Sequence, residues 1–200
     1  MSEPQHITTA QGRRIAYHLT QGVGPCVVFL GGFKSDMAGT KAVFLQDWAV
    51  AQGRAFLRLD YSGHGVSGGR FEDGAIGDWF EDARAVIDAV VPGPVVLVGS
   101  SMGGWIALLL ARVMPDRIAG LVGIAAAPDF TEDSMWAGFS DAQKTELAQG
   151  QVALPSEYDP AGYIIPRRLI DEGRSRLVLR DPLALPFPVR LLQGTADADV

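Results

Sequence analysis

Short apolar runs rich in β-branched residues alternate with longer amphipathic stretches along most of the chain. Runs of the first kind predict buried strands, and stretches with apolar residues on one face predict helices. Strands are predicted at residues 13–20, 26–30, 55–60, 95–99, 118–127 and 188–194, and helices at residues 41–52, 78–90 and 102–114. This alternation is typical of an α/β fold, in which a mostly parallel sheet carries helices on both faces. The strand at 13–20 is expected to be an early antiparallel addition.

The alternation weakens between residues 128 and 186, where short helical pieces carry scattered aromatic side chains. These aromatic residues are Trp136, Phe139, Tyr158 and Tyr163. We expect this segment to be a small cap-like insertion before the last predicted strand. No repeat, low-complexity segment or linker divides the chain, so we expect residues 1–200 to form one domain.

Composition excludes several classes of function. The formal net charge is −6 and the arginines are scattered, whereas nucleic-acid binders carry a basic patch, so no nucleic-acid partner is expected. The single cysteine, Cys26, excludes an internal disulfide and is expected to be a buried thiol in a reducing compartment. No apolar run approaches the ~18 residues of a membrane span, and the first residues lack the apolar core of a signal peptide. We therefore expect a cytoplasmic protein without a membrane span, a metal or an organic cofactor.

The pattern Gly-x-Ser-x-Gly occurs at residues 65–69 and again at residues 99–103. A nucleophile elbow needs a buried strand before the serine, a helix after it and small residues two positions to either side. Ser101 meets these conditions, since the run VVLV precedes it and the run MGGWIALLL follows it. Ser67 precedes the segment GGRFEDG, which does not begin a helix easily, and is expected to be a loop residue. Ser100 comes one position early, so its side chain is expected to point away from the apex of the turn.

An acyl-transfer site also needs N–H donors for the oxyanion. The amide of Met102 lies at the expected helix N-terminus beside Ser101, and a second donor is expected from the loop after the CVVFL strand. That loop has the sequence GGFKSDM, and Phe33 is the expected donor because it follows the paired glycines. Two structural alternatives stay open, because Gly31 and Gly32 also fit a plain strand-to-helix turn and Ser101 also fits a helix N-cap.

Four segments resemble the α/β-hydrolase superfamily, in the order that this family has. They are SDMAGTKA at 35–42, RLDYSGHGVSGG at 58–69, LVGSSMGGW at 97–105 and VRLLQGTADADV at 189–200. The first and third are most similar to the mitochondrial palmitoyl-protein thioesterase and acyl-glucuronide esterase group of abhydrolase-domain proteins. The resemblance implies the α/β-hydrolase fold and a serine hydrolase that cleaves thioesters or carboxylic esters.

The resemblance also implies a triad acid after the last predicted strand. There the family pattern Gly-x-x-Asp matches residues 194–197, which makes Asp197 the expected acid. Asp199 lies two residues further on, and Asp129 follows strand 118–127, where some members of the superfamily carry the acid. Both stay open as alternatives. Each of the three aspartates could also be an ordinary surface carboxylate without a catalytic role.

The histidine that should follow the acid is missing from the chain. His6 lies in the first segment and His18 in the early strand, and both are expected to be structural or solvated. His64 lies on the loop after the AFLRLD strand, at the same sheet edge as Ser101, but the family carries an Asp-x-x-Gly-x-Gly-x-Ser loop there without needing a base. We therefore expect the 200 residues to be part of a longer enzyme whose histidine lies beyond Val200, and the segment alone to be nearly inactive.

The expected reaction is a two-step acyl transfer on a small-molecule ester or an acylated protein. Ser101 attacks the carbonyl carbon, and side chains of the insertion form an acyl pocket or pack as plain core. The aliphatic residues in question are Leu154, Ile164 and Ile165. A general carboxylesterase and a non-catalytic hydrolase-like binding module are the alternative functions.

Overall fold

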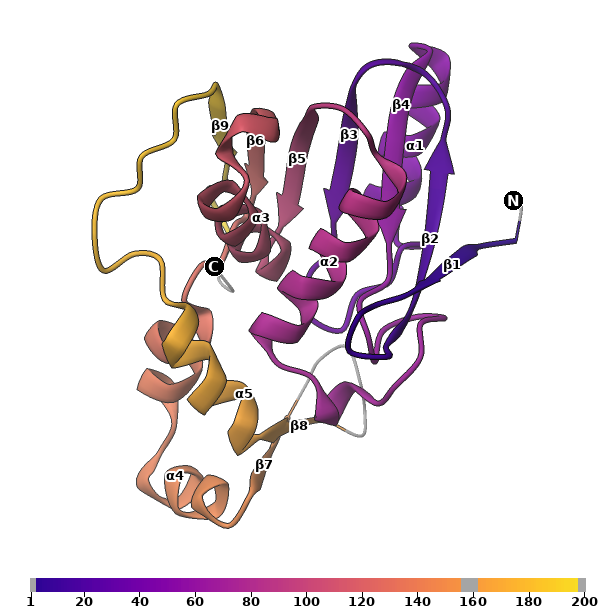
Figure 1. Ribbon diagram of the computed structural model, residues 1–200. Helices are drawn as coiled ribbons and strands as arrows, with labels where there is room; N and C mark the ends of the chain where they lie inside the picture. The colour runs from indigo at the N-terminus through magenta and orange to yellow at the C-terminus, as the bar shows by residue number, and fades with distance from the viewer. Residues whose placement is uncertain (1–2, 156–161, 198–200) are drawn as a thin grey trace.

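A twisted, mostly parallel sheet forms the centre of the molecule (Figure 1). The computed structural model of the chain describes residues 3–155 and 162–197, so Tyr158 and Asp199 lie outside the described residues. Within that part, the central sheet has seven strands in the order β1-β2-β4-β3-β5-β6-β9. Their bounds are Gln5–Thr8 (β1), Arg14–Thr20 (β2), Val23–Leu30 (β3), Arg54–Leu59 (β4), Val95–Ser100 (β5), Ile118–Ile124 (β6) and Val189–Leu192 (β9). β1 and β2 are antiparallel additions at one edge, and the pairs from β4 to β9 are parallel.

Helices cover both faces of this sheet, as the sequence predicts. On one face α1 (Thr40–Ala51) packs its buried Ala42 and Ala49 against apolar residues of β3, β4 and β5. On the other face α2 (Ile76–Val90) and α3 (Met102–Val113) enclose the larger core (Figure 1). Short 3₁₀ turns lie at Phe71–Asp73 (η1), Pro115–Arg117 (η2) and Arg174–Arg176 (η4). None of the helices in residues 3–155 and 162–197 is long and apolar enough to cross a bilayer.

Local features explain two boundaries that differ from the prediction and one strand that was not predicted. α2 begins at Ile76, two residues early, because the Asp78 carboxylate accepts a hydrogen bond of 3.0 Å from the Ala75 amide and so closes the first turn. β6 ends at Ile124 because the next residue, Ala125, has a φ of 44° and turns the chain out of the sheet. The edge strand β1 was not predicted, since it is short and lacks an apolar run.

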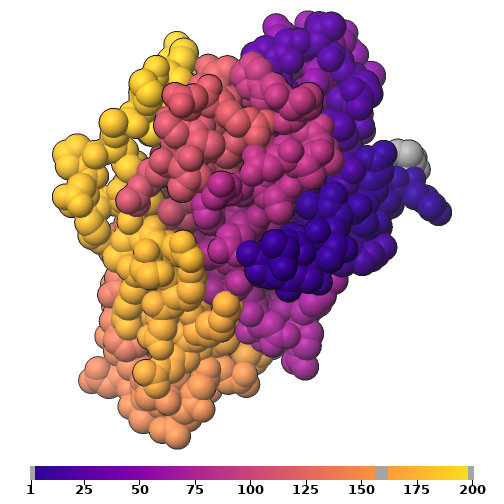
Figure 2. Space-filling view, viewed as in Figure 1, coloured from indigo at the N-terminus to yellow at the C-terminus, as the bar shows by residue number. Residues whose placement is uncertain are grey.

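The segment between β6 and β9 folds into an insertion at one end of the sheet, drawn in orange at the bottom of Figure 2. It comprises a π-helix at Thr131–Trp136 (η3), α4 (Asp141–Ala148), β7 (Gln151–Leu154), β8 (Tyr163–Pro166) and α5 (Arg167–Gly173). The expectation of helical pieces alone was incomplete, because β7 and β8 pair as an antiparallel ribbon. These strands are four residues each, too short for period-2 alternation to stand out.

Candidate active site

Ser101 is the single residue between the end of β5 and the start of α3, where the chain turns sharply. Its φ is 51° and its ψ is −121°, a conformation that L-residues rarely adopt and that marks strain at a turn. A Cβ atom on Gly99 would lie 2.4 Å from the Gly103 carbonyl oxygen, and one on Gly103 would lie 2.0 Å from the Leu30 carbonyl oxygen. Both neighbours are backbone atoms, so only glycine fits at either position. The turn therefore has the strand, serine and helix geometry that the sequence pattern predicts.

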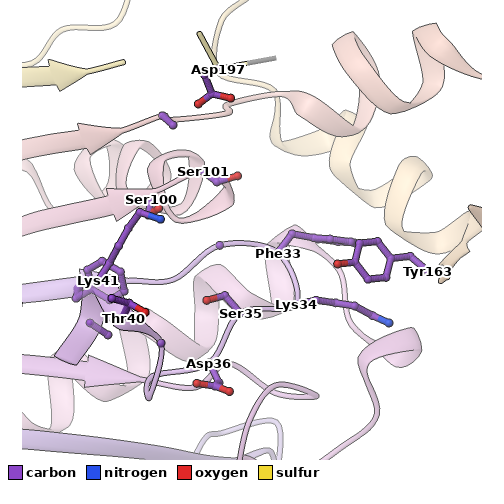
Figure 3. A pocket seen from close by; sticks show the side chains of 15 residues that line it. Phe33, Lys34, Ser35, Asp36, Thr40, Lys41, Ser100, Ser101, Tyr163 and Asp197 are labelled. Carbon is purple, nitrogen blue, oxygen red and sulfur yellow. The ribbon is translucent and has the colours of Figure 1, made fainter. Parts of the chain in front are cut away.

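The two competing serines occupy different environments. The Ser67 hydroxyl donates to the Asp60 carbonyl at 2.6 Å and accepts from the Ala16 amide at 2.8 Å, so it fastens a loop to β2 and β4. Ser100 is the last residue of β5 and is 8% exposed. It lies beside Ser101 at the wall of the same cavity, rather than facing wholly away from it (Figure 3).

A cavity of about 540 Å³ opens beside Ser101. Its walls come from the turn between β5 and α3, the loop between β3 and α1, the insertion and the segment after β9 (Figure 3). The polar and aromatic residues that line these walls are Phe29, Phe33, Lys34, Ser35, Asp36, Thr40, Lys41, Ser100, Ser101, Tyr163 and Asp197. The structure thus brings the predicted residues Ser101, Phe33 and Asp197 to one cavity, although they come from three distant parts of the chain.

Two backbone amides beside Ser101 are free to donate. The Phe33 loop runs close to the serine, since a Cβ atom on Gly32 would lie 3.4 Å from the Ser101 Cβ and 3.9 Å from its Oγ. Met102 is the first residue of α3, where backbone amides have no intrahelical acceptor. In the described part of the chain, neither the Phe33 amide nor the Met102 amide donates to a protein acceptor. This arrangement suits an anionic oxygen next to Ser101.

Two buried charged residues, Arg58 on β4 and Asp60 just after it, hold the loop that carries Phe33. The Asp60 carboxylate accepts hydrogen bonds from the Met37 amide at 2.6 Å and from the Val66 amide at 2.9 Å. The Arg58 guanidinium donates to the Met37 carbonyl and, at 2.5 Å, to the Gln46 side chain. Burial raises the pKa of Asp60, and the two amide hydrogen bonds oppose that rise. The loop is therefore tied to the sheet at Met37, just past the cavity.

Asp197 lies on the cavity wall across from the Phe33 loop, above Ser101 in Figure 3. Its amide donates to the Gly194 carbonyl at 3.3 Å, which forms the short turn after β9. The alternative, Asp129, is fully buried, and its carboxylate accepts from the Val178 amide at 2.8 Å and the Leu179 amide at 2.9 Å. Asp129 therefore anchors the end of the insertion and does not line the cavity.

None of the histidines is among the described residues that line the cavity. His6 and His18 lie on the edge strands β1 and β2. The His64 ring is 4% exposed and packs edge-on against Tyr61, Phe71 and Trp79, while its Nδ1 lies 3.1 Å from the Ser62 carbonyl oxygen. Burial lowers the pKa of His64 to about 4, so the ring is neutral at pH 7. His64 is thus a core residue of an aromatic cluster.

Sequence patterns missed part of the cavity wall. Lys34, on the loop between β3 and α1, and Lys41, in the first turn of α1, line the cavity, but no sequence pattern marks them as facing Ser101. Of the insertion residues expected at an acyl pocket, Tyr163 lines the cavity, whereas Phe139 and Ile165 are buried in the main core.

In residues 3–155 and 162–197 no group of acidic, histidine or cysteine side chains has the arrangement of a metal site. Burial raises the pKa of the Cys26 thiol to about 11, which fits a structural thiol.

Comparison with known proteins places the chain in a family. Residues 23–183 match the Hydrolase_4 family, described as serine aminopeptidase, S33. The mitochondrial palmitoyl-protein thioesterase ABHD10 of Mus musculus is 38% identical over 184 residues, which cover 92% of this chain and 62% of that protein. The chain therefore spans about three fifths of the length of this curated relative.

Two solved structures share the fold at close range. A putative hydrolase from Agrobacterium vitis S4 has a TM-score of 0.95 and 43% sequence identity, covering 99% of this chain and 81% of that chain. The mouse α/β hydrolase domain-containing protein 10 has a TM-score of 0.88 and 34% identity, covering 98% of this chain and 79% of that chain. Both likenesses extend over the sheet, the helices and the insertion of this chain.

The predicted cytoplasmic location is contradicted by the same comparison, because the mouse relative and its rat and bovine counterparts are named as mitochondrial proteins. The prediction used a lone cysteine and the lack of an apolar leader, and neither feature separates one reducing compartment from another. The fold and the predicted α/β-hydrolase resemblance agree with the family match. The chain belongs to the Hydrolase_4 family of α/β-hydrolases, described as serine aminopeptidase, S33.

Proposed function

We propose that this protein is a serine hydrolase that cleaves thioesters or carboxylic esters, with Ser101 as its nucleophile. The observation that carries the proposal is the strained Ser101 at the apex of the β5–α3 turn, facing a cavity of about 540 Å³. Strain of this kind persists only where the surrounding structure imposes it, and here backbone contacts at Gly99 and Gly103 do so. The thioesterase name of the mouse relative supports the reaction class.

The reaction proceeds in two acyl-transfer steps. Ser101 Oγ attacks the carbonyl carbon while its proton passes to a histidine base, and the resulting oxyanion accepts hydrogen bonds from the Phe33 and Met102 amides. The leaving thiolate or alkoxide takes the proton and departs, so that the acyl group remains on Ser101. Water then attacks the acyl carbon, the same base takes its proton, and the carboxylic acid leaves as Ser101 regains its hydrogen.

Asp197 orients the histidine base and stabilises its positive charge. The supporting observation is its place on the wall of the Ser101 cavity, while the Asp129 carboxylate is occupied by two backbone amides elsewhere. None of His6, His18 and His64 is assigned as the base, because the first two lie on edge strands and the third is buried among aromatic rings. All activity tests therefore use the full-length natural protein.

The insertion between residues 128 and 186 acts as a cap over the acyl group. Its Tyr163 reaches the cavity from β8, beside the Phe33 side chain. The proposed substrate is an acylated protein or a small acyl thioester, which the name of the mouse relative favours. A general carboxylesterase is the second candidate, because the Methylococcus capsulatus relative, 30% identical over 193 residues, is a methyl ester esterase by name.

Turnover assays separate these functions. The full-length protein is tested on short and long p-nitrophenyl esters, on acyl-coenzyme A and on an S-acylated peptide, each with Ser101→Ala and Ser67→Ala variants. We expect a preference for long acyl thioesters, complete loss in Ser101→Ala, and normal turnover in Ser67→Ala. A preference for short esters makes the protein a carboxylesterase, and no turnover of any substrate makes it a non-catalytic binding module.

A further inference from the structure

The turn that presents the Phe33 amide holds a residue in an unfavourable conformation. The Ser35 amide donates to the Gly32 carbonyl at 3.1 Å, so Phe33 and Lys34 are the two central residues of a tight turn. Lys34 has a φ of 53°, in the left-handed region that glycine favours and that side chains with a Cβ avoid. A lysine at this position needs compensation from contacts of its own side chain.

Those contacts come from aromatic rings on two other segments. The Lys34 Nζ atom lies 4.9 Å from the centre of the Phe71 ring and 4.7 Å from the centre of the Tyr163 ring. At these distances the ammonium group is attracted by both ring faces, and the attraction is of the same order as the cost of the left-handed backbone. Lys34 thus joins η1 and the insertion strand β8 to the turn.

The Phe33 ring also contacts aromatic rings outside the turn. Its centre lies 4.8 Å from that of Phe71, 5.6 Å from that of Phe130 and 6.1 Å from that of Tyr163, all with edge-to-face geometry. Figure 3 shows the Phe33 and Lys34 side chains both extending toward Tyr163. Both central residues of the turn are therefore fixed by side chains from outside it.

We propose that Lys34 and Tyr163 are positioning residues, which hold the turn so that the Phe33 amide points at the oxyanion. This inference rests on the proposed function, because the Phe33 amide matters only if an oxyanion forms at Ser101. When either contact is removed, Lys34 relaxes out of its left-handed conformation and the backbone of the turn shifts. The insertion strand β8 thereby controls whether the catalytic site is assembled, in addition to covering the acyl group.

The test compares variants that remove each contact with variants that keep it. In the full-length protein, Lys34→Met removes the charge and Tyr163→Leu removes the ring, whereas Lys34→Arg and Tyr163→Phe keep the cation and the ring. We expect Lys34→Met and Tyr163→Leu each to lower kcat by about 10- to 100-fold with KM changed by less than about threefold, because a displaced donor weakens binding of the transition state only. The kcat of Lys34→Arg and of Tyr163→Phe should stay within about twofold of the wild-type value. The double variant that combines Lys34→Met with Tyr163→Leu should have a kcat no lower than that of the slower single variant.

Two controls separate a positioning role from a general effect of removing a cation–ring contact. Lys144→Met removes a similar contact elsewhere in the insertion, where Nζ lies 5.2 Å from the Trp136 ring centre, and should leave kcat unchanged. A long-chain trifluoromethyl ketone, which forms a tetrahedral adduct with a reactive serine, should bind Lys34→Met and Tyr163→Leu more weakly by the same factor as kcat falls. Unchanged kcat in these variants, or a rise in KM alone, overturns the positioning role while leaving Ser101 as the nucleophile. Full turnover in Ser101→Ala instead overturns the proposed function itself.

Discussion

Two of the turns at the cavity wall, those of Ser101 and Lys34, each hold a residue other than glycine with a positive φ. Ser101, at 51°, lies between the glycines at positions 99 and 103, which let the backbones of β5, α3 and β3 approach closely. Lys34, at 53°, is fixed by rings that come from distant segments. The sequence pattern that marks the first turn is therefore local, while the contacts that hold the second come from segments distant in sequence, including the insertion.

The third component of the cavity, Asp197, gives the largest expected effect. Asp197→Asn should lower kcat of the full-length protein by ~10⁴-fold with little change in KM, because an amide favours the wrong imidazole tautomer and does not stabilise the imidazolium. Steady-state kinetics on an acyl thioester measures this change. The matched variant is Asp129→Asn, which should keep kcat within about tenfold but lose ~1–3 kcal/mol of unfolding free energy, since an NH2 group replaces the oxygen that accepts from one of the two buried amides. The reverse pattern would assign the acid to Asp129.

The close approach of β3 to the Ser101 turn predicts a severe effect from a single methyl group. Gly103→Ala should lower the free energy of unfolding by at least ~3 kcal/mol, because the new Cβ would lie 2.0 Å from a carbonyl oxygen of β3 and neither backbone yields easily. Urea denaturation measures the loss. Gly93→Ala is the control, since a Cβ there meets nothing within 4 Å, and should change stability by less than ~0.5 kcal/mol. Equal stability of the two variants would contradict the requirement for glycine at position 103.

The assembled region near Lys34 carries a pH-dependent element, His64. Its pKa in the folded protein is about 4, below the ordinary value of 6.5, because burial disfavours the charged ring. Between these values the unfolded chain binds more protons, so the His64 contribution to stability is intact above pH 6.5 and is lost as the pH falls toward 4. The total loss is ~3 kcal/mol.

His64→Phe should remove this part of the pH dependence. The free energy of unfolding, measured by urea denaturation from pH 7 to pH 4, should fall less steeply in the variant than in the wild type. Asp60 and Asp82 titrate with the opposite sign, because burial raises the pKa of each, and their contribution cancels in the comparison. Identical slopes would mean that His64 is protonated in the folded state.

The contrast between the turns also explains what could be predicted from the sequence. The strand, glycine and helix pattern around Ser101 is local, and the positions of β5 and α3 were predicted within one residue. The left-handed backbone of Lys34 left no local trace, because it depends on Phe71 and Tyr163, which are distant in sequence. The β7–β8 ribbon was missed for a related reason, since its short strands are stabilised by packing of residues such as Val152 and Ile165 in the main core.

The central claim, that Ser101 is the nucleophile, is tested most directly by identifying the residue that a fluorophosphonate probe labels. After labelling of the full-length protein, peptide mass spectrometry should find the adduct on Ser101 and on neither Ser100 nor Ser67. Ser101→Ala should abolish labelling, while Ser100→Ala and Ser67→Ala should retain it. Persistent labelling of Ser101→Ala, or an adduct on Ser100, would contradict the assignment of the β5–α3 turn as the catalytic elbow.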